Sequence, residues 1–511
     1  MTDCVYDPQT CTGCGACAAR CPQRAIRMEI GEEGFVWPVV DIDKCVGCGL
    51  CARICPAEHP VCENAEKPEC LAAAAADELR RDSSSGAVFP LLAERVLQEG
   101  GTVFGAARDE DGTVRHIGVD DLDGLRKLKS SKYVQSETGN CYRQAEELLK
   151  AGREVLFSGT PCQIAGLNAF LGRKYDNLLT VDVVCHGVPS PLAFRRYAEE
   201  LTEEGKEKVL AVNFRDKVRG WYPYFLTVKT EENVYSSDCR ENEFMRAFLA
   251  NLCLRKSCAA CPFARFPRQG DLTLGDFWGI GRHAPDLDDN LGTSLVLINT
   301  ERGRRRMAEL TPRLKFRRSL PLARAIEGNP SLVRPPVPHP RRDYFFARLE
   351  QLPFKQNVSH CFNNRYDCGI LNFWFGSNYG AMLTCYALQE SVKRLGLKPK
   401  VINYVPANVN FVGSLAETFA GKYLDLTELC TNAEELRRLN RETRAFIVGS
   451  DQVWRHKYSR LFGRDLFWLS FAAPNAKKIA YAASFGRDRW EADFESTLAA
   501  KYYISRFDRV S

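Results

Sequence analysis

Cysteines are the residues of this chain whose number and spacing point most directly to chemistry, since 22 occur among 511 residues. Eight of them form two copies of the pattern C-x2-C-x2-C-x3-C followed by proline: Cys11, Cys14, Cys17 and Cys21, then Cys45, Cys48, Cys51 and Cys55. Three thiolates on a tight glycine-containing loop bind three irons of a cubane, and the fourth cysteine crosses to the other cluster. The spacing therefore predicts two 4Fe-4S clusters, one held by Cys11, Cys14, Cys17 and Cys55 and the other by Cys45, Cys48, Cys51 and Cys21.

Zinc is the alternative to iron at these cysteines. Four cysteines within eleven residues suit a cubane better than a tetrahedral ion. The repeat resembles the bacterial two-cluster ferredoxins over residues 1 to about 60. Such a segment relays single electrons and transforms no substrate by itself, so the rest of the chain must supply a donor or an acceptor. Three further cysteines, Cys4, Cys62 and Cys70, lie outside the pattern, and we expect them to be free thiols.

A second group of cysteines predicts a third metal site. Cys253, Cys258 and Cys261 have the spacing C-x4-C-x2-C at the end of a helical run over 241–252. Three ligands need a fourth, and Cys162 or Cys185 can supply it. We predict a third 4Fe-4S cluster here, with Cys185 among its ligands. Zinc and no metal remain the alternatives.

Two loops carry the residues that could do chemistry in the middle of the chain. Residues 158–167 predict the end of a strand, a glycine turn and the start of a helix. Thr160 is the expected N-cap, and Pro161 occupies the first helical position. Amides at such a helix start attract phosphate or lower the pKa of a thiol, which makes Cys162 a catalytic candidate. The alternative is an ordinary capped helix with a buried cysteine. His186 follows the strand over 178–184 and is a candidate for proton transfer, or else a structural histidine.

The elements that must position these residues alternate between helix and strand. We predict a helix over 71–82 and a linker over 83–86. The following segments alternate as helix 91–98, strand 102–107, helix 145–150 and strand 154–157. The fold class is therefore multidomain α/β, with a small α+β two-cluster ferredoxin head and a central α/β domain. The expected domains are a head (1–65), a helix and linker (66–86), a central domain (87–333), a Pro/Arg-rich connector (334–362) and a C-terminal domain (363–511).

Several motifs of the central region occur together in order: G-T-P-C-Q, V-C-H-G-V-P-S, F-R-D-K, and C-x2-C-P-F followed by G-D-L-T-L-G-D-F-W-G-I. With them the chain resembles the beta-subunit family of coenzyme F-420 hydrogenases and dehydrogenases over about residues 85–350. The resemblance implies FAD beside a 4Fe-4S cluster, with hydride exchanged with a soluble carrier such as a 5-deazaflavin. It also implies that the flavin contacts two loops, through Lys129, Ser130, Lys132, Tyr133, Gln135, Ser136, Gly159, Thr160, Pro161 and Gln163.

The C-terminal region carries a third set of motifs. N-Y-G-A (378–381), V-G-S-D-Q-V-W (448–454) and Y-A-A-S-F-G (481–486) resemble the polysaccharide pyruvyl transferase family from about residue 367 to the end. The resemblance implies the Rossmann-like half of a glycosyltransferase-like fold with two lobes, and a glycan acceptor. The chain stops at Ser511, where the second lobe should begin, so we expect a truncated domain. Asn378, Asp451 and Ser484 either line an acceptor cleft or cap loops.

Composition and charge narrow the class of function. The net charge of +6 hides an acidic head and a basic segment over 301–348, which has 13 Lys/Arg against 4 Asp/Glu. That segment lacks interleaved aromatic residues, so we predict a solvated face and no nucleic-acid partner. No apolar run is long enough to span a bilayer, and reduced thiols fit a cytoplasmic protein.

We favour a flavin-dependent iron–sulfur oxidoreductase with a redox partner protein or a soluble hydride carrier. The alternatives are a pyruvyl transferase with an accessory redox half, and a noncatalytic electron-transfer adapter.

Overall fold

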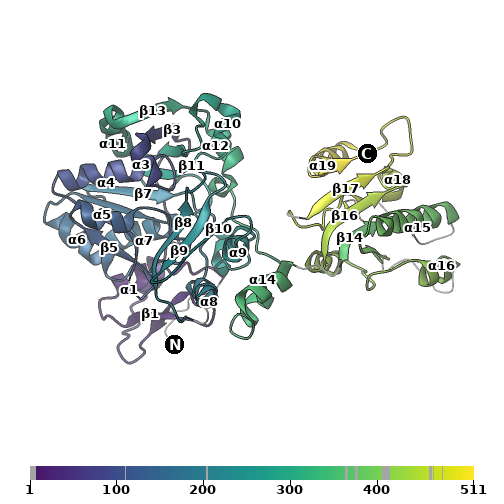
Figure 1. Ribbon diagram of the computed structural model, residues 1–511, viewed down its shortest axis with the longest axis horizontal. Helices are drawn as coiled ribbons and strands as arrows, with labels where there is room; N and C mark the ends of the chain where they lie inside the picture. Colours follow the sequence, from purple (N-terminus) through teal and green to yellow (C-terminus); the bar gives the residue numbers. More distant parts are fainter. Residues whose placement is uncertain are drawn as a thin grey trace. The chain divides into compact units, whose positions relative to one another are not determined.

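The computed structural model describes residues 7, 9–109, 111–202, 205–362, 366–374, 378–405, 415–459, 463, 465–474 and 476–511. It divides into two compact units, Met1–Val358 and Ser359–Ser511 (Figure 1). The predicted head and central domain both lie within the first unit. Within the described residues, no helix combines the length and apolar character that a membrane span requires.

The N-terminal head is built from two short helices and a β-hairpin. Its elements are α1 (Ala16–Arg20), β1 (Ile26–Ile30), β2 (Val36–Val40) and α2 (Leu50–Arg53), with β1 and β2 antiparallel. Gly15 and Gly49 precede the two helices with φ of +79° and +67°. Glycine adopts this left-handed conformation without strain, so each cysteine loop can turn directly into its helix.

An eight-stranded mixed sheet is the framework of the first unit, in the order β13-β3-β12-β11-β7-β6-β4-β5. Strands β4, β6, β7 and β11 are parallel neighbours, and every other pairing in the sheet is antiparallel, so β5, β12 and β13 run opposite to these four strands and β3 runs with them. The bounds of the eight strands are β3 (Glu69–Ala75), β4 (Thr102–Arg108), β5 (Val114–Val119), β6 (Val155–Gly159), β7 (Leu178–Val183), β11 (Leu272–Asp276), β12 (Ser294–Ile298) and β13 (Leu314–Ser319).

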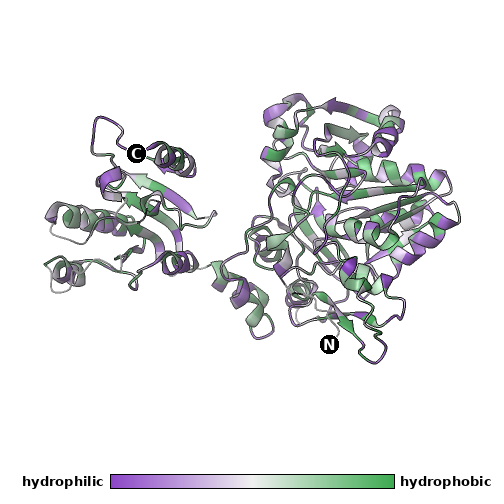
Figure 2. Ribbon diagram, turned by 180° about the vertical axis from the view of Figure 1, so that it is seen from behind, coloured by the Kyte–Doolittle hydropathy of each residue, from purple (hydrophilic) through white to green (hydrophobic). Residues whose placement is uncertain are grey.

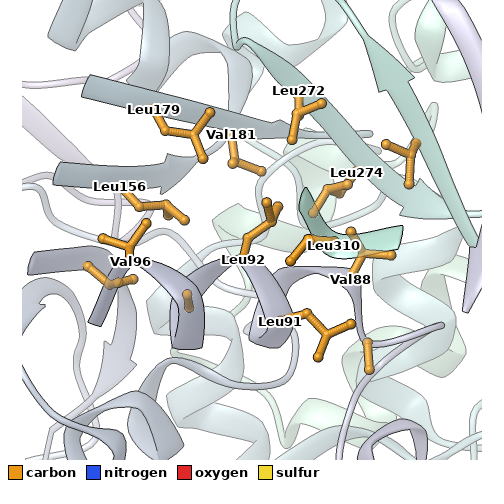
Figure 3. Packing of buried hydrophobic residues seen from close by; sticks show 14 of the residues in the cluster. Val88, Leu91, Leu92, Val96, Leu156, Leu179, Val181, Leu272, Leu274 and Leu310 are labelled. Carbon is orange, nitrogen blue, oxygen red and sulfur yellow. The ribbon is translucent and has the colours of Figure 1, made fainter. Parts of the chain in front are cut away.

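Helices cover both faces of this sheet. On one face α4 (Val88–Gln98), α5 (Leu122–Leu128) and α11 (Glu301–Leu310) bury apolar side chains, among which Leu92, Val96 and Leu310 meet strand residues (Figure 3). On the other face α6 (Cys141–Lys150) and α7 (Pro161–Leu171) pack together with Cys14 and Ala16 of the head. Figure 2 shows mostly hydrophobic colouring on the central strands and mixed colouring on the helices, as expected for helices with one buried face.

The segment 71–82, predicted as a helix, is mostly a strand. Residues Glu69–Ala75 form β3, which pairs with β12 and β13, and only Asp77–Arg81 forms a helix, α3. Alanine favours helices, but Leu71 to Ala75 are fully buried inside the sheet. Tertiary packing therefore overrides the local preference.

The remaining elements of the first unit lie around the sheet. A three-stranded antiparallel sheet has the order β10-β9-β8. Its strands and the helices nearby are α8 (Pro191–Leu201), β8 (Val209–Asp216), β9 (Phe225–Thr230), β10 (Val234–Asp238), α9 (Glu243–Leu249), α10 (Ile280–His283), α12 (Leu322–Gly328) and α13 (Arg342–Ala347). The proline-rich segment 334–340 packs on the unit, because Asn251 Nδ2 donates to the carbonyl of Val337 at 2.8 Å. Helix α14 (Phe354–Phe362) follows it.

The second unit contains a five-stranded parallel sheet in the order β15-β14-β16-β17-β18. Its core gathers Trp454, Trp468 and Phe446 on one side of the sheet. The elements are β14 (Tyr366–Leu371), α15 (Tyr379–Arg394), β15 (Pro399–Val401), α16 (Leu415–Tyr423), α17 (Ala433–Arg438), β16 (Thr443–Gly449), α18 (His456–Ser459), β17 (Lys477–Tyr481), α19 (Phe494–Ile504) and β18 (Arg509–Val510). The parallel sheet agrees with the predicted α/β class.

His116 on β5 makes the stability of the first unit sensitive to acid. Its Nε2 donates to the carbonyl of Ser158 at 3.0 Å, and the hydroxyl of Ser136 donates to its Nδ1 at 2.7 Å. Burial lowers the pKa of His116 to about 4. An unfolded histidine titrates near 6.5, so between these two pH values only the unfolded state takes up the proton. The contribution to stability is present above pH 6.5 and is lost as the pH falls towards 4.

We expect His116→Gln to remove about 2 kcal/mol of the pH-dependent loss of stability between pH 7 and pH 5. Anaerobic urea unfolding followed by tryptophan fluorescence at the two pH values measures this loss. His59→Gln, at an exposed histidine, is the matched control and should leave it unchanged. An identical pH dependence in wild type and His116→Gln would contradict the assignment.

Candidate iron–sulfur and flavin sites

Four cysteines of the head come together beneath α1, and we call Cys11, Cys14, Cys17 and Cys55 the inner set. Helix α1 carries Cys17 and packs against α2, which leads directly to Cys55. Burial raises the pKa of the Cys17 thiol to about 12, and the charges of Cys11 and Cys55 add to the rise. These four cysteines are the ones that the spacing assigns to one cluster, and their role as ligands stays a prediction.

The inner set is held against the central sheet by hydrogen bonds to the Cys14 carbonyl. That oxygen accepts from the hydroxyl of Tyr142 at 2.9 Å and from Oγ1 of Thr138 at 3.1 Å. Gly166 of α7 permits the close approach, because a Cβ there would lie 3.2 Å from Cys14 Sγ and 2.8 Å from the Tyr142 oxygen. Arg143 Nε also donates to the Ala19 carbonyl at 2.9 Å.

The other four head cysteines, Cys21, Cys45, Cys48 and Cys51, form what we call the outer set. Cys48 is exposed and the other three are half-buried. Apolar side chains around them also face solvent, with Ile42 76% and Val46 65% exposed. The outer set therefore lies at the surface of the head, whereas the inner set lies at its junction with the sheet.

A third group of cysteines meets at the carboxyl edge of the parallel strands, and we call Cys162, Cys185, Cys258 and Cys261 the sheet-edge set. Cys162 follows β6 and Cys185 follows the neighbouring strand β7. Cys258 lies in a 3-10 helix (Lys256–Ala260), and its Sγ accepts from the Val188 amide at 3.4 Å. Burial raises the pKa of the Cys185 thiol, and the charges of Cys258, Cys162 and Cys261 raise it further.

Cys253 does not join this set, although we expected it as a ligand. It is fully buried, its pKa is raised by burial to about 12, and the one side-chain charge that perturbs it is that of Arg342. The chain between Cys253 and Cys258 turns away, because the Arg255 amide pairs with the Val188 carbonyl at 2.9 Å. Cys162, the catalytic candidate, occupies the position expected of Cys253.

Ligand sets made of cysteines alone suit an iron–sulfur cubane. Across the described residues, no three His, Cys, Asp or Glu side chains converge on one ion. Each thiolate of a cubane binds its own iron, so its ligands surround a volume and do not converge on one point. Burial raises the pKa of Cys162 to about 11 and of Cys258 to about 12, so bound positive metal is what would stabilise their thiolates.

Part of the predicted flavin loops is taken up by contacts inside the protein. The amide oxygen of Gln135 accepts from Val36 of the head at 2.9 Å, and Ser136 bonds to His116. Gln163 accepts from the Thr160 amide at 3.0 Å and donates to the Ser136 carbonyl at 3.1 Å. With Pro161 at the first position, these bonds confirm the predicted helix start. Gly159 lies against Gln163, so this half of the predicted set supports the head and α7.

The other residues predicted to contact the flavin include Tyr133, which lies near Arg215 and Asp276 at the same sheet edge. We call Arg215 and Asp276 with their polar neighbours the polar cluster. Tyr133 packs on Phe248 with ring centres 4.8 Å apart, and Arg215 pairs with Asp276 at 2.8 Å. Asp276 ends β11, the parallel neighbour of β7. Arg215 is 3% exposed, and its Nε has no hydrogen-bond partner in the described structure.

Lysines complete this polar cluster. Lys132 donates to the carbonyls of Lys127 and Lys129 at 2.9 and 2.7 Å, and burial lowers its pKa to about 7. Lys217 donates to three backbone carbonyls, and burial lowers its pKa to about 7 as well. Ser130 has φ of +67° and its hydroxyl donates to Asn213 Oδ1 at 3.3 Å. Arg215 and Tyr133 thus place a buried cation beside an aromatic ring at this sheet edge.

His186 lies between the sheet-edge set and α9. Its ring meets Phe248 edge-on at 5.2 Å. Burial lowers the pKa of His186, and the Asn251 side chain opposes that shift. Within the described part of the chain, Nε2 has no hydrogen-bond partner within 3.5 Å.

In the second unit, the loops that follow β16 and β17 are joined to each other. The Ser484 amide donates to the Asp451 carbonyl at 2.9 Å, and the Ser484 hydroxyl accepts from Gly486 at 2.9 Å. Asn378 caps α15 by accepting from Ala381 at 3.2 Å. Asn378 and Ser484 therefore make capping hydrogen bonds, and the Asp451 carbonyl joins the two loops.

Sequence reasoning did not select Arg215, Asp276 or Arg255 as site residues. Arg215 and Asp276 lie in the motifs F-R-D-K and G-D-L-T-L-G-D-F-W-G-I, which served only to identify the family. Arg255 stands between Cys253 and Cys258, where a basic residue among predicted ligands was the available signal.

A two-set cysteine head docked on an α/β sheet that presents further cysteines is the architecture of an iron–sulfur electron-transfer protein. Residues 10–59 match the family model for the 4Fe-4S dicluster domain. Residues 152–317 match the model for the C terminus of the coenzyme F420 hydrogenase/dehydrogenase beta subunit. Residues 378–511 match the polysaccharide pyruvyl transferase model. The first two matches support an iron–sulfur oxidoreductase that transfers electrons.

Solved structures are also similar to part of this chain. A chain of the F420-reducing [NiFe] hydrogenase complex from Methanosarcina barkeri is 16% identical, covers 57% of this chain and 90% of its own length, and gives a TM-score of 0.35. No curated protein matches the chain.

Proposed function

We propose that the first unit is a flavin-dependent oxidoreductase that relays electrons between the surface of the head and a two-electron carrier. In this proposal the outer, inner and sheet-edge sets each hold a 4Fe-4S cluster. A flavin, when bound, supplies the exchange between single electrons and hydride. The carrier is a soluble hydride carrier of the deazaflavin type or a redox partner protein.

The observation that carries the proposal is the order of the cysteine sets through the first unit. The outer set is at the surface, the inner set lies at the junction with Cys14 buried and its other three cysteines half-buried, and the sheet-edge set follows. Burial is the main cause of the raised pKa of the Cys14 thiol, and the charge of Cys162 raises this pKa further. Thr12, between two inner ligands, forms a hydrogen bond that lowers the raised pKa of Cys162. The inner and sheet-edge sets are therefore direct neighbours.

The chain's own residues supply a binding surface at the far end of this series. Arg215 offers a buried N–H without a partner, Asp276 fixes its orientation, and Tyr133 offers an aromatic face. A cation near a flavin ring nitrogen stabilises its reduced anionic form. We assign Arg215, Lys132, Tyr133 and Ser130 to this surface, in place of Gln135, Ser136 and Gln163.

An anaerobic preparation tests the proposal. We expect about twelve irons per chain, a flavin absorption band, and loss of that band when a reduced hydride carrier is added. Nicotinamide, flavin and deazaflavin carriers are compared in turn. About eight irons without flavin would instead identify a noncatalytic adapter.

The match of residues 378–511 favours a second candidate, transfer of a pyruvyl group from phosphoenolpyruvate to a glycan. Phosphate release that depends on a sugar acceptor would support it. We rank it below the redox function because Asn378 and Ser484 make capping hydrogen bonds and the Asp451 carbonyl joins two loops.

A further inference from the structure

Arg255 connects two of the proposed cluster sites, and its role goes beyond fixing the fold. Its backbone belongs to the sheet-edge set, because its carbonyl accepts from the Cys258 amide at 3.1 Å and its amide donates to Val188 at 2.9 Å. Its side chain reaches the inner set, where Nε donates to the Cys11 carbonyl at 2.9 Å. Nη2 lies 3.8 Å from Cys11 Sγ and points a donor at that ligand.

The guanidinium is held rigidly in this position. It stacks on Trp37 at 3.6 Å from the ring centre, and Nη1 donates to the Val36 carbonyl at 3.1 Å. Gly13 leaves space for it, since a Cβ there would lie 3.0 Å from Nη1. The stacking and the planar fork fix the cation in one orientation, which a lysine would not reproduce.

The charge of Arg255 has no carboxylate to balance it. The residue is 2% exposed, and the described structure contains no ion pair between Arg255 and an acidic side chain. The nearby carboxylate of Glu33 pairs with Arg342 at 2.5 Å and with Lys256 at 3.7 Å. A buried cation without a counter-charge is costly. The cysteine charges that act on Arg255 are those of Cys11, Cys258 and Cys162, from both neighbouring sets.

We infer that Arg255 is a shared counter-cation that raises the reduction potentials of the inner and sheet-edge clusters together. A cluster held by four thiolates is anionic and becomes more so on reduction, and hydrogen bonds and charge near the sulfurs set its potential. A fixed cation between two such clusters stabilises an electron on either one. Because the cation is shared, both potentials shift upward together, although the repulsion between electrons on the two clusters is itself unchanged. This inference rests on the proposed function.

Redox titration followed by electron paramagnetic resonance tests the inference in the full chain. We expect Arg255→Gln to lower the ratio of reduced to oxidised inner and sheet-edge cluster about tenfold at a fixed potential, equivalent to about 59 mV for a one-electron couple. The outer cluster should change less. Arg255→Lys keeps a charge and should give a smaller shift. Arg306→Gln, which removes a charge that is paired with Glu99 and Glu154, should give none.

Iron content separates the possible outcomes. Full iron with unchanged potentials in Arg255→Gln overturns the inference and leaves the proposed function standing. Wild-type protein that binds no iron overturns the proposed function instead. If Arg255→Gln fails to assemble, pulsed resonance on wild type with ¹⁵N-labelled arginine decides: an arginine nitrogen coupled to a reduced cluster supports the inference, and its absence overturns it.

Discussion

Cys162→Ala is expected to remove about four of about twelve irons, whereas Cys253→Ala is expected to keep all of them. Cys162 belongs to the sheet-edge set, where the charge of Cys261 is the largest side-chain contribution to its pKa after burial. Cys253 is fully buried outside that set. Iron analysis and resonance spectra of anaerobic protein measure the difference.

The two variants are matched, because each removes one sulfur from a buried or half-buried cysteine of the same unit. Cys258→Ala should behave as Cys162→Ala does and leave the two head clusters intact. If Cys253→Ala loses a cluster and Cys162→Ala does not, the revised ligand set is wrong and the original spacing argument is right.

Asp182→Asn is expected to lower the free energy of unfolding of the first unit by about 3 to 5 kcal/mol, because it leaves a buried cation unpaired. Asp182 is fully buried and accepts from Arg268 Nη2 at 3.3 Å, from Gln269 at 3.0 Å and from Gly270 at 3.1 Å. Arg268 is 1% exposed. These bonds tie the loop after Cys261 to β7, which leads into Cys185. Anaerobic urea unfolding gives the stability.

The same variant should lose iron from the sheet-edge cluster before the head clusters on mild heating. Asp176→Asn is the control, since the Asp176 carboxylate that pairs with Arg302 is fully exposed and such surface pairs contribute little. Equal midpoints for wild type and Asp182→Asn would show that the Arg268 charge is compensated elsewhere.

Local patterns predicted those parts of the fold and site that depend on local physics. Thr160 and Pro161 fix the start of α7 from their own capping chemistry, and the strand before Cys185 is a short buried run. The repeat also led us to expect Cys55 near Cys11 and Cys14, where the structure places it. Parallel strands β6 and β7 then necessarily bring Cys162 and Cys185 to one edge.

What could not be predicted depends on contacts between distant segments. The alanine-rich run became β3 because β12 and β13 flank it. Cys253 fits a ligand spacing, but the pairing of Arg255 with Val188 directs only Cys258 to the site. Gln135 bonds to Val36, 99 positions earlier in the sequence, a contact that no motif indicates. Arg255 acts through the same kind of long-range contact.

The docking of the head has a consequence for the rate of electron transfer. Hydrogen bonds from Tyr142, Thr138 and Arg143 hold the loop that carries Cys14 and the helix that follows it. The head is therefore fixed against the sheet and does not move between an external partner and the central domain. Under the proposed function, the spacing between redox centres would be set during folding, and no domain movement would be needed in each turnover. The turnover rate would then depend on how fast the external partner binds and not on movement of the head domain.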